Sequence, residues 1–148
     1  MHIYKGSCHC GLVQFEIHKQ EPIDTLMECN CSICTKKGIL HTPVENDELV
    51  IVSGKNDQSL YQFGTKVARY TFCPRCGCSA FHRSRGNQYR YSVNARCLDD
   101  LDALLQDNKI WFLNGRDHPF DRNSKQIETL PIPYRSHSGE ITEDVIKE

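Results

Sequence analysis

Eight of the nine cysteines in this 148-residue sequence lie in three short segments, which read CHC at 8–10, CNCSIC at 29–34 and CPRCGC at 73–78. In a reducing compartment, so many cysteines indicate metal ligands or reactive thiols rather than disulfides. The odd total also argues against complete internal pairing. The chemistry to consider first is therefore zinc bound by thiolates.

The first and third segments together predict one structural zinc site. Cys73 and Cys76 are followed by Gly77, a pattern that lets two sulfurs converge on one ion while glycine permits the turn. Cys8 and Cys10 alternate along the chain, so on a strand both side chains point to the same face. Together the thiolates would complete a tetrahedron and tie the start of the chain to its middle. The alternative is that Cys73 and Cys76 are buried without a metal.

The middle segment supplies Cys29, Cys31 and Cys34 and offers no obvious fourth ligand. Three protein ligands with one open position are typical of catalytic zinc. Because a metal-bound thiol loses its proton more easily than a free one, such a site suits a substrate thiol better than hydrolysis. We therefore expect the second zinc to be catalytic.

Other residues could instead close that second site and make its ion structural. Cys78 follows Cys76 closely in a predicted strand and could act as a ligand or line the site. Cys97, in the segment NARCLDD, is expected to be a small buried hydrophobe, although it could also be a ligand. A histidine such as His41 is the remaining candidate.

The segments that position these cysteines predict a mainly β fold with few short helices. Alternating or β-branched residues predict strands at 12–17, 49–54 and 88–95, and the segments 59–64 and 67–72 flank Gly64-Thr65 like a hairpin. Leucines at helical spacing predict a helix over 98–105, with single turns at 46–49 and 143–148. Trp111 and Phe112 are expected to pack a strand into the core, or to wall a substrate pocket, before a turn at Gly115 and Pro119.

Composition and length favour one globular domain, which we place at 1–135, followed by a polar C-terminal tail at 136–148. Lys and Arg number 18 against 19 acidic residues, so no overall positive charge attracts nucleic acid. The first residues lack the pattern of a signal peptide, and no long apolar run predicts a membrane span. We expect a cytoplasmic protein.

The cysteine segments resemble the signature segments of the glutathione-dependent formaldehyde-activating enzyme family, which includes the centromere protein V-like proteins. The matching stretches are GSCHCGLVQFEI, ECNCSICTKKG, FCPRCGCSAF and VNARCLDD, and the resemblance runs from about Gly6 to Asp121. Asn30 stands where many members have histidine, and Cys78 stands where threonine commonly follows. Neither difference removes a ligand, but both adjoin ligand positions and so concern the identity of the substrate.

The resemblance implies a β-tent fold of antiparallel sheets stapled by two Zn²⁺ ions per chain. It assigns Cys8, Cys10, Cys73 and Cys76 to the structural ion, and Cys29, Cys31 and Cys34 to the catalytic ion. It further implies a carbon–sulfur lyase activity, in which S-hydroxymethylglutathione is formed from, or broken into, glutathione and formaldehyde. The implied partners are thus a small thiol such as glutathione and a small aldehyde or related electrophile.

Four residues near the cysteines are candidates for substrate binding: Lys36, Lys37, Asn94 and Arg96. Lys36 and Lys37 directly follow the triplet and could offset its negative charge or contact the carboxylates of glutathione. Both could equally be solvated surface lysines. Arg96 could orient substrate, or could only pair with Asp99 or Asp100. His9 and His82 are expected to be hydrogen-bonded structural residues.

Two further interpretations compete with the enzyme. A non-catalytic zinc-stapled binding module would have closed zinc sites and a macromolecular partner, but the sequence carries no basic or Pro- and Arg-rich extension. A CxxC redox protein is disfavoured because neither CxxC is expected to open a helix after a strand in a βαβ unit.

Overall fold

The computed structural model describes residues 1–85, 89–117, 134–135 and 141–142. The strands are β1 His2–Ser7, β2 Gln14–Lys19, β3 Leu26–Cys29, β4 His41–Glu45, β5 Leu49–Ser53, β6 Ser59–Tyr61, β7 Arg69–Phe72, β8 Phe81–Arg83, β9 Arg90–Asn94, β10 Ile110–Leu113, β11 Tyr134–Arg135 and β12 Ile141–Thr142. The helices are α1 Ser32–Lys37 and α2 Leu101–Asp107, with 3₁₀ turns η1 Ala95–Cys97 and η2 Gly115–Asp117. The prediction of a mainly β protein with few short helices is confirmed.

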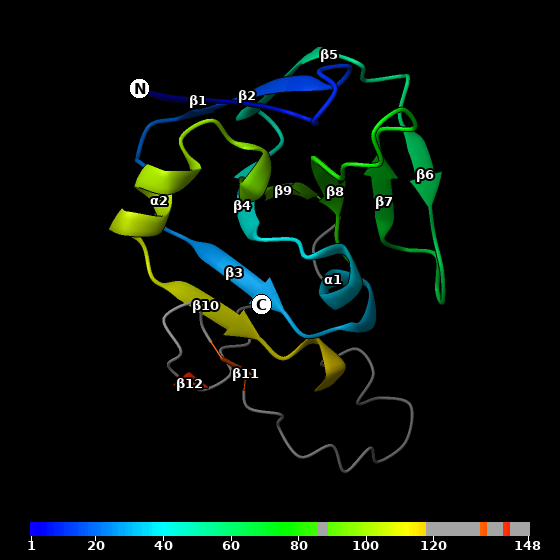
Figure 1. Cartoon of the computed structure of the whole chain (residues 1–148), viewed down its shortest axis with the longest axis vertical. Helices are drawn as coiled ribbons and strands as arrows, with labels where there is room; N and C mark the ends of the chain where they lie inside the picture. The colour runs from blue at the N-terminus through cyan, green and yellow to red at the C-terminus, as the bar shows by residue number, and fades with distance from the viewer. Residues whose placement is uncertain (86–88, 118–133, 136–140, 143–148) are drawn as a thin grey trace.

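Two sheets make up the body of the described chain. The smaller sheet is three-stranded in the order β1-β2-β5, and the larger is seven-stranded in the order β10-β3-β4-β9-β8-β7-β6. All pairings in these sheets are antiparallel except that of β10 with β3, which is parallel. In Figure 1 the larger sheet curves from β10 and β3 through β4 and β9 to β7 and β6, and α1 lies in the opening between its ends.

The hydrophobic core lies between the two sheets. Along β2, Phe15 and Ile17 are buried while Gln14 faces solvent, as the alternation of residues 12–17 predicts. The Phe15 ring meets the ring of Phe81 on β8 edge to face, with centroids 5.6 Å apart. Edge-to-face aromatic pairs add about 0.5–1.5 kcal/mol to the burial of their area. This contact joins the smaller sheet to the larger one.

The predicted helix at 98–105 forms three residues later than expected. The side-chain oxygen of Asn94 accepts a hydrogen bond from the Arg96 backbone at 3.2 Å and so starts the short turn η1 first. The backbone of Asp99 then donates to the Lys5 carbonyl on β1 at 2.9 Å, which keeps this stretch extended. The helix α2 begins only at Leu101, and Leu104 packs into the core.

The helix α1 was not predicted, and it lies within the cysteine triplet. Cys31 caps its N-terminus, and Gly38 ends it with a left-handed φ of 64°. The CxxC of Cys31 and Cys34 therefore opens a helix after a strand, but outside the βαβ unit that a redox protein of this type would need. The next strand, β4, runs antiparallel to β3, so the segment is not a βαβ unit of the thioredoxin type.

The predicted single domain over 1–135 stays a prediction. Of the predicted tail at 136–148, only β12 lies within the described residues, and the helical turn expected at 143–148 lies outside them. Pro119 also lies outside them. In the part of the chain that the structure describes, every helix is too short or too polar to cross a membrane.

Candidate metal centres

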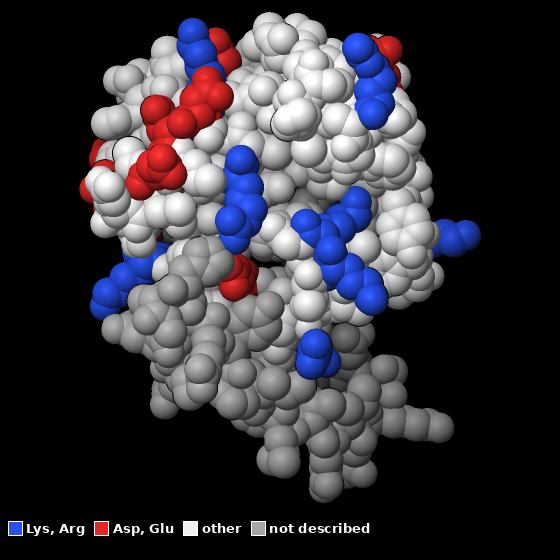
Figure 2. Space-filling view, in the orientation of Figure 1, with Lys and Arg blue, Asp and Glu red and all other residues white. Residues whose placement is uncertain are grey.

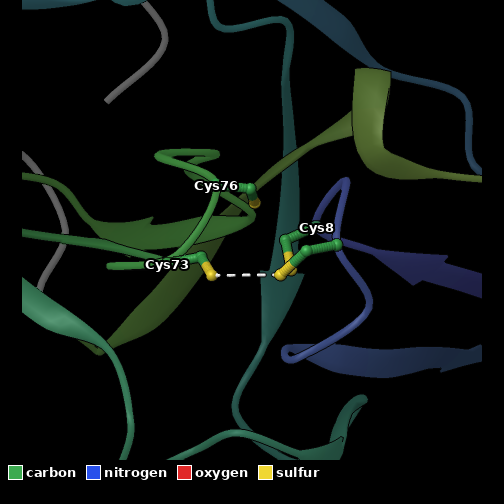
Figure 3. Close-up of side chains that lie close together, drawn as sticks. Cys8, Cys73 and Cys76 are labelled. Carbon is green, nitrogen blue, oxygen red and sulfur yellow. Dashed lines mark hydrogen bonds between the residues drawn. The ribbon is translucent and has the colours of Figure 1, made fainter.

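The thiols of Cys8, Cys10, Cys73 and Cys76 converge, and their sulfur atoms all lie within 4.8 Å of one another. The sulfur of Cys10 is 3.7 Å from that of Cys8 and 3.6 Å from that of Cys73. Figure 3 shows Cys8 and Cys73 facing each other across the space between their two segments, with Cys76 beside them. Tetrahedral zinc with Zn–S bonds of about 2.3 Å places its sulfurs about 3.8 Å apart, so this group fits a zinc ion.

Two tight turns hold this four-cysteine cluster. The backbone N–H of Val13 donates to the Cys8 sulfur at 3.3 Å, which orients that sulfur toward the cluster. In the other turn Gly77 has a φ of 79° and donates to the Cys73 carbonyl at 2.8 Å. Backbone N–H groups of Cys78 and Cys10 lower the pKa of Cys76 to about 5, which favours the thiolate form that binds metal.

Cys78 and Cys97 lie near the four-cysteine cluster. The backbone N–H of His9 lowers the pKa of Cys78, but burial and the neighbouring Cys76 outweigh it and raise the pKa overall. Burial together with Cys78 raises the pKa of Cys97 to about 12. Cys97 packs half-buried against the core, as expected of a small hydrophobe. Neither thiol belongs to either group of converging ligands among the described residues.

The second group contains the thiols of Cys29, Cys31 and Cys34, whose sulfur atoms also lie within 4.8 Å of one another. The end of β3 supplies Cys29, and α1 carries Cys34. Backbone N–H groups point at the sulfurs, from Cys31 to Cys29 at 3.4 Å and from Cys34 to Cys31 at 3.5 Å. We call this group the three-cysteine cluster.

The ionisation of the three-cysteine cluster fits a cation-binding site. Hydrogen bonds from the thiols of Cys29 and Cys34 lower the pKa of Cys31. The contact with Cys31 raises the pKa of Cys29, and the contact with Cys29 raises that of Cys34. Without a cation, one thiolate is stabilised at the expense of the other two. A bound divalent ion would let all of them ionise.

His41 does not join the three-cysteine cluster in this structure. Its Nδ1 lies 2.6 Å from the Ser92 hydroxyl, and its Nε2 has no hydrogen-bond partner among the described residues. Burial lowers the pKa of His41 to about 4 and, helped by His41, that of His82 to about 3. His82 stacks on Tyr70 with centroids 4.9 Å apart. These are buried, neutral imidazoles near the cluster, since the Cys31 charge influences both.

Sequence analysis missed a set of hydrogen bonds beside the three-cysteine cluster. They link Asn30 to Asn114 and Arg116, and we call this group the clamp. The Asn30 side chain, only 1% exposed, donates to the Asn114 side chain at 3.0 Å. Its oxygen accepts from the Arg116 backbone at 3.0 Å, and its carbonyl accepts from Arg116 Nε at 2.8 Å. Gly115 lies so close that an added Cβ would overlap the Cys29 sulfur. Only the position of Asn30 between two ligands signalled its importance in the sequence.

The predicted substrate-binding residues lie in different environments. Lys36 is exposed, whereas Lys37 is half-buried, donates to the Ser79 hydroxyl at 2.8 Å and lies over the Phe72 ring. The guanidinium of Arg96 lies 3.8 Å from the carboxylate of Glu28. Figure 2 shows Lys and Arg side chains bordering a hollow near the middle of the face on which α1 lies.

Asn94 is fully engaged with backbone groups. Its side-chain oxygen accepts from Leu40 at 3.3 Å and from Arg96 at 3.2 Å, and its amide donates to the Ser79 carbonyl at 3.1 Å. These bonds hold the end of β9 against the start of β4. A substrate contact by Asn94 stays a prediction.

Comparisons with known proteins agree with this geometry. The family model of the glutathione-dependent formaldehyde-activating enzyme matches residues 3–114. A Halomonas elongata protein, whose name gives it provisionally as a glutathione-dependent formaldehyde-activating enzyme, is 32% identical over 82 residues. That match covers 50% of this chain and 52% of the relative, so the alignment spans about half the length of each.

A solved structure of similar fold is a crystal structure of a Rhodobacter sphaeroides protein. It superposes with a TM-score of 0.60 at 36% sequence identity, covering 64% of this chain and 87% of that one. The family model spans both cysteine clusters and most of the larger sheet. This chain therefore belongs to the glutathione-dependent formaldehyde-activating enzyme family.

Proposed function

We propose that the protein is a zinc-dependent carbon–sulfur lyase. Its substrates would be adducts of glutathione, or a similar thiol, with formaldehyde or another small electrophile. The observation that carries the proposal is the three-cysteine cluster, in which no fourth Cys, His, Asp or Glu ligand joins the converging sulfurs within the described residues. The family and the name of the Halomonas elongata relative support glutathione and formaldehyde as the substrates.

Cys29, Cys31 and Cys34 would hold the catalytic zinc, and Cys8, Cys10, Cys73 and Cys76 the structural one. When bound, the catalytic zinc supplies a Lewis-acidic position that stabilises a substrate thiol as its thiolate. Three thiolates outweigh the charge of the divalent ion, and a fourth adds to the excess. Nearby cations must offset this charge for the thiol to bind.

Lys37 is the best placed of the predicted cations to do so. Its ammonium group is fixed by the Ser79 hydroxyl and the Phe72 ring. Burial lowers the pKa of Lys37, whereas the Cys34 charge raises it, so the cation and the cluster stabilise each other. Lys36, exposed on the last turn of α1, would contribute through longer-range attraction only.

The reaction itself joins or separates sulfur and carbon. In the synthetic direction the thiol sulfur forms a bond to the carbonyl carbon of the aldehyde, and the carbonyl oxygen takes up the proton that the thiol lost. The reverse reaction breaks the C–S bond and returns that proton to sulfur. No oxidant or reductant is needed. The protein's contribution is to orient the two reactants and to keep the thiol ionised.

The decisive experiment measures zinc content and zinc coordination with and without glutathione. Elemental analysis of the wild type should give two zinc ions per chain, and of Cys29→Ser only one. X-ray absorption at the zinc edge should show one zinc gaining a sulfur ligand when glutathione is added. Of these two proteins, only the wild type should accelerate the formation of S-hydroxymethylglutathione.

A different coordination result would overturn the proposal. Two zinc ions that each already hold four protein ligands, unchanged by glutathione, would leave no position for a substrate thiol. The protein would then be a zinc-stapled binding module with a macromolecular partner. Thiol coordination without turnover of formaldehyde would keep the thiol site and direct the search to other small aldehydes.

A further inference from the structure

We propose that Arg116 is the carboxylate-recognising residue of the three-cysteine cluster, held in position by Asn30 and Asn114. The ligand class is a small thiol that carries a carboxylate, as opposed to a neutral thiol. This inference rests on the proposed function, because it assigns a specificity residue to the same site. Arg116 was not among the residues that sequence analysis selected.

Arg116 has a fixed position beside the three-cysteine cluster. Asn30 lies between the ligands Cys29 and Cys31, and its carbonyl accepts a hydrogen bond from Arg116 Nε at 2.8 Å. The Asn30 side chain accepts from the Arg116 backbone at 3.0 Å. Both the backbone and the side chain of Arg116 are therefore tied to the peptide that joins two cluster cysteines.

The segment that carries Arg116 is packed directly against the sulfurs. The Asn30 backbone donates to the Leu113 carbonyl at 3.2 Å, which continues the pairing of β3 with β10 beyond Cys29. At Gly115 an added Cβ would also lie 2.8 Å from the Cys31 Cβ. Because Gly115 packs against Cys29 and Cys31, the next residue, Arg116, lies at the edge of the three-cysteine cluster.

Arg116 keeps hydrogen-bond donors that a ligand can use. A guanidinium has five N–H donors in a planar fork, and the Asn30 carbonyl uses only the one at Nε. The terminal nitrogens keep the geometry that matches both oxygens of a carboxylate. Arg116 is exposed, so this fork is accessible from solvent, and its Nε bond to Asn30 keeps it next to the peptide that joins Cys29 and Cys31.

The other cations around the cluster are engaged in different ways. Arg96 has the Glu28 carboxylate beside it, which reduces its attraction for a second anion. Lys37 donates to the Ser79 hydroxyl and lies over the Phe72 ring, and its ammonium group can attract an anion only as a point charge. Arg116 therefore combines a fixed position with a planar fork suited to a carboxylate.

The test measures thiol binding directly on protein loaded with Co²⁺ in place of zinc. Binding of a thiolate to cobalt intensifies the sulfur-to-cobalt charge-transfer absorption, which gives a dissociation constant without any turnover. The probes are glutathione and glutathione diethyl ester, which share the thiol but differ in free carboxylates. The variants are Arg116→Gln, Arg116→Lys and the control Lys109→Gln, an exposed cation just before the other end of β10.

We expect the wild type to bind glutathione about tenfold more tightly than the diester, as for the loss of a charge-assisted bidentate contact. Arg116→Gln should weaken glutathione binding by about tenfold and leave the diester unchanged. Arg116→Lys, which keeps the charge without the fork, should fall between. Lys109→Gln should match the wild type with both probes.

Two kinds of failure are distinguishable. Equal affinity of the wild type for glutathione and the diester, or equal weakening of both by Arg116→Gln, would overturn the inference while leaving the open thiol site intact. A wild-type spectrum that no thiol changes would overturn the proposed function and this inference together. If Arg116→Gln fails to retain cobalt, the wild-type preference and Arg116→Lys still decide the question.

Discussion

The two cysteine clusters are built from the same ligand and differ in almost everything else. The four-cysteine cluster takes its ligands from two turns far apart in sequence, beside β1 and β7. The three-cysteine cluster takes all its ligands from one short segment, and its remaining surroundings are the clamp, neutral imidazoles and cations. The four-cysteine cluster closes a long loop of chain, whereas the three-cysteine cluster leaves room for a ligand from outside the protein.

Under the proposed function, this difference would let one kind of metal ion serve two purposes in a small protein. An ion held by distant segments stabilises the fold, because removing it releases the whole intervening chain. An ion held by a local segment contributes less to the fold and can keep an exchangeable position.

Replacing Cys73 with Ser should remove the fold-stabilising ion. Cys73 is completely buried, and its sulfur meets a thiol from the other sheet's turn. Structural zinc contributes about 10–16 kcal/mol in small peptides, which is comparable to the stability of a whole domain. We expect Cys73→Ser to be largely unfolded by circular dichroism at 25 °C. A cooperative melt near that of the wild type would contradict a stabilising role.

Replacing Cys34 with Ser should affect function far more than folding. The variant should lose one of two zinc ions and at least about 100-fold in activity, while its free energy of unfolding falls by about 1–3 kcal/mol. Elemental analysis, kinetics and urea unfolding on one preparation provide the measurement. If Cys34→Ser unfolds as readily as Cys73→Ser, the contrast between the clusters is wrong.

Gly115→Ala should distort the three-cysteine cluster without changing any ligand. Its Cβ must displace the Cys29 sulfur or the Cys31 side chain. Groups that hold metal ligands in place typically change metal affinity by about 10–100-fold, and we expect about tenfold weaker binding of one zinc. The other zinc, in the four-cysteine cluster, is the internal control in a chelator titration. Equal weakening of both ions would count against a local effect.

The imidazoles beside the three-cysteine cluster should make stability depend on pH. Burial and His41 lower the pKa of His82 to about 3, so below its ordinary value of 6.5 the unfolded chain binds a proton that the native chain does not. Stability is therefore fully present above pH 6.5 and is lost as the pH falls toward 3. Between pH 7 and pH 5, His82→Phe should reduce this loss by about 1–2 kcal/mol.

Urea unfolding of the wild type and His82→Phe at each pH measures that difference, and contributions from the cysteines cancel between the two proteins. His2→Gln, at an exposed histidine, is the matched control and should behave as the wild type. Parallel pH profiles for the wild type and His82→Phe would show that burial of this imidazole carries no such cost.

The features that sequence could predict are those set by neighbouring residues. The alternation along β2 and the β-branched run of β5 follow from a period of two, and the structure has strands at both places. The pairing of Cys8 with Cys10 and of Cys73 with Cys76 also followed from their spacing, and the structure brings the sulfurs of each pair together. These signals are local, so no knowledge of the fold was needed.

The features that escaped prediction depend on distant contacts or on very short elements. The helix α1 has six residues, too few to show an apolar period. The parallel pairing of β3 with β10 joins segments more than 80 positions apart, and the clamp between Asn30 and Arg116 exists only because of it. The position of Cys97 near the four-cysteine cluster likewise follows only from the folded structure.

The short helix α1 has a consequence for how occupancy could be followed in solution. A helix of this length is unstable alone in water, so its persistence depends on what anchors its ends. Cys31 caps the N-terminus, and at the C-terminus the amide of Gly38 donates to the carbonyl of Cys34, the buried cysteine within the helix, at 2.9 Å. Hydrogen exchange at this amide should therefore report, on a single backbone proton, how long the ion stays bound.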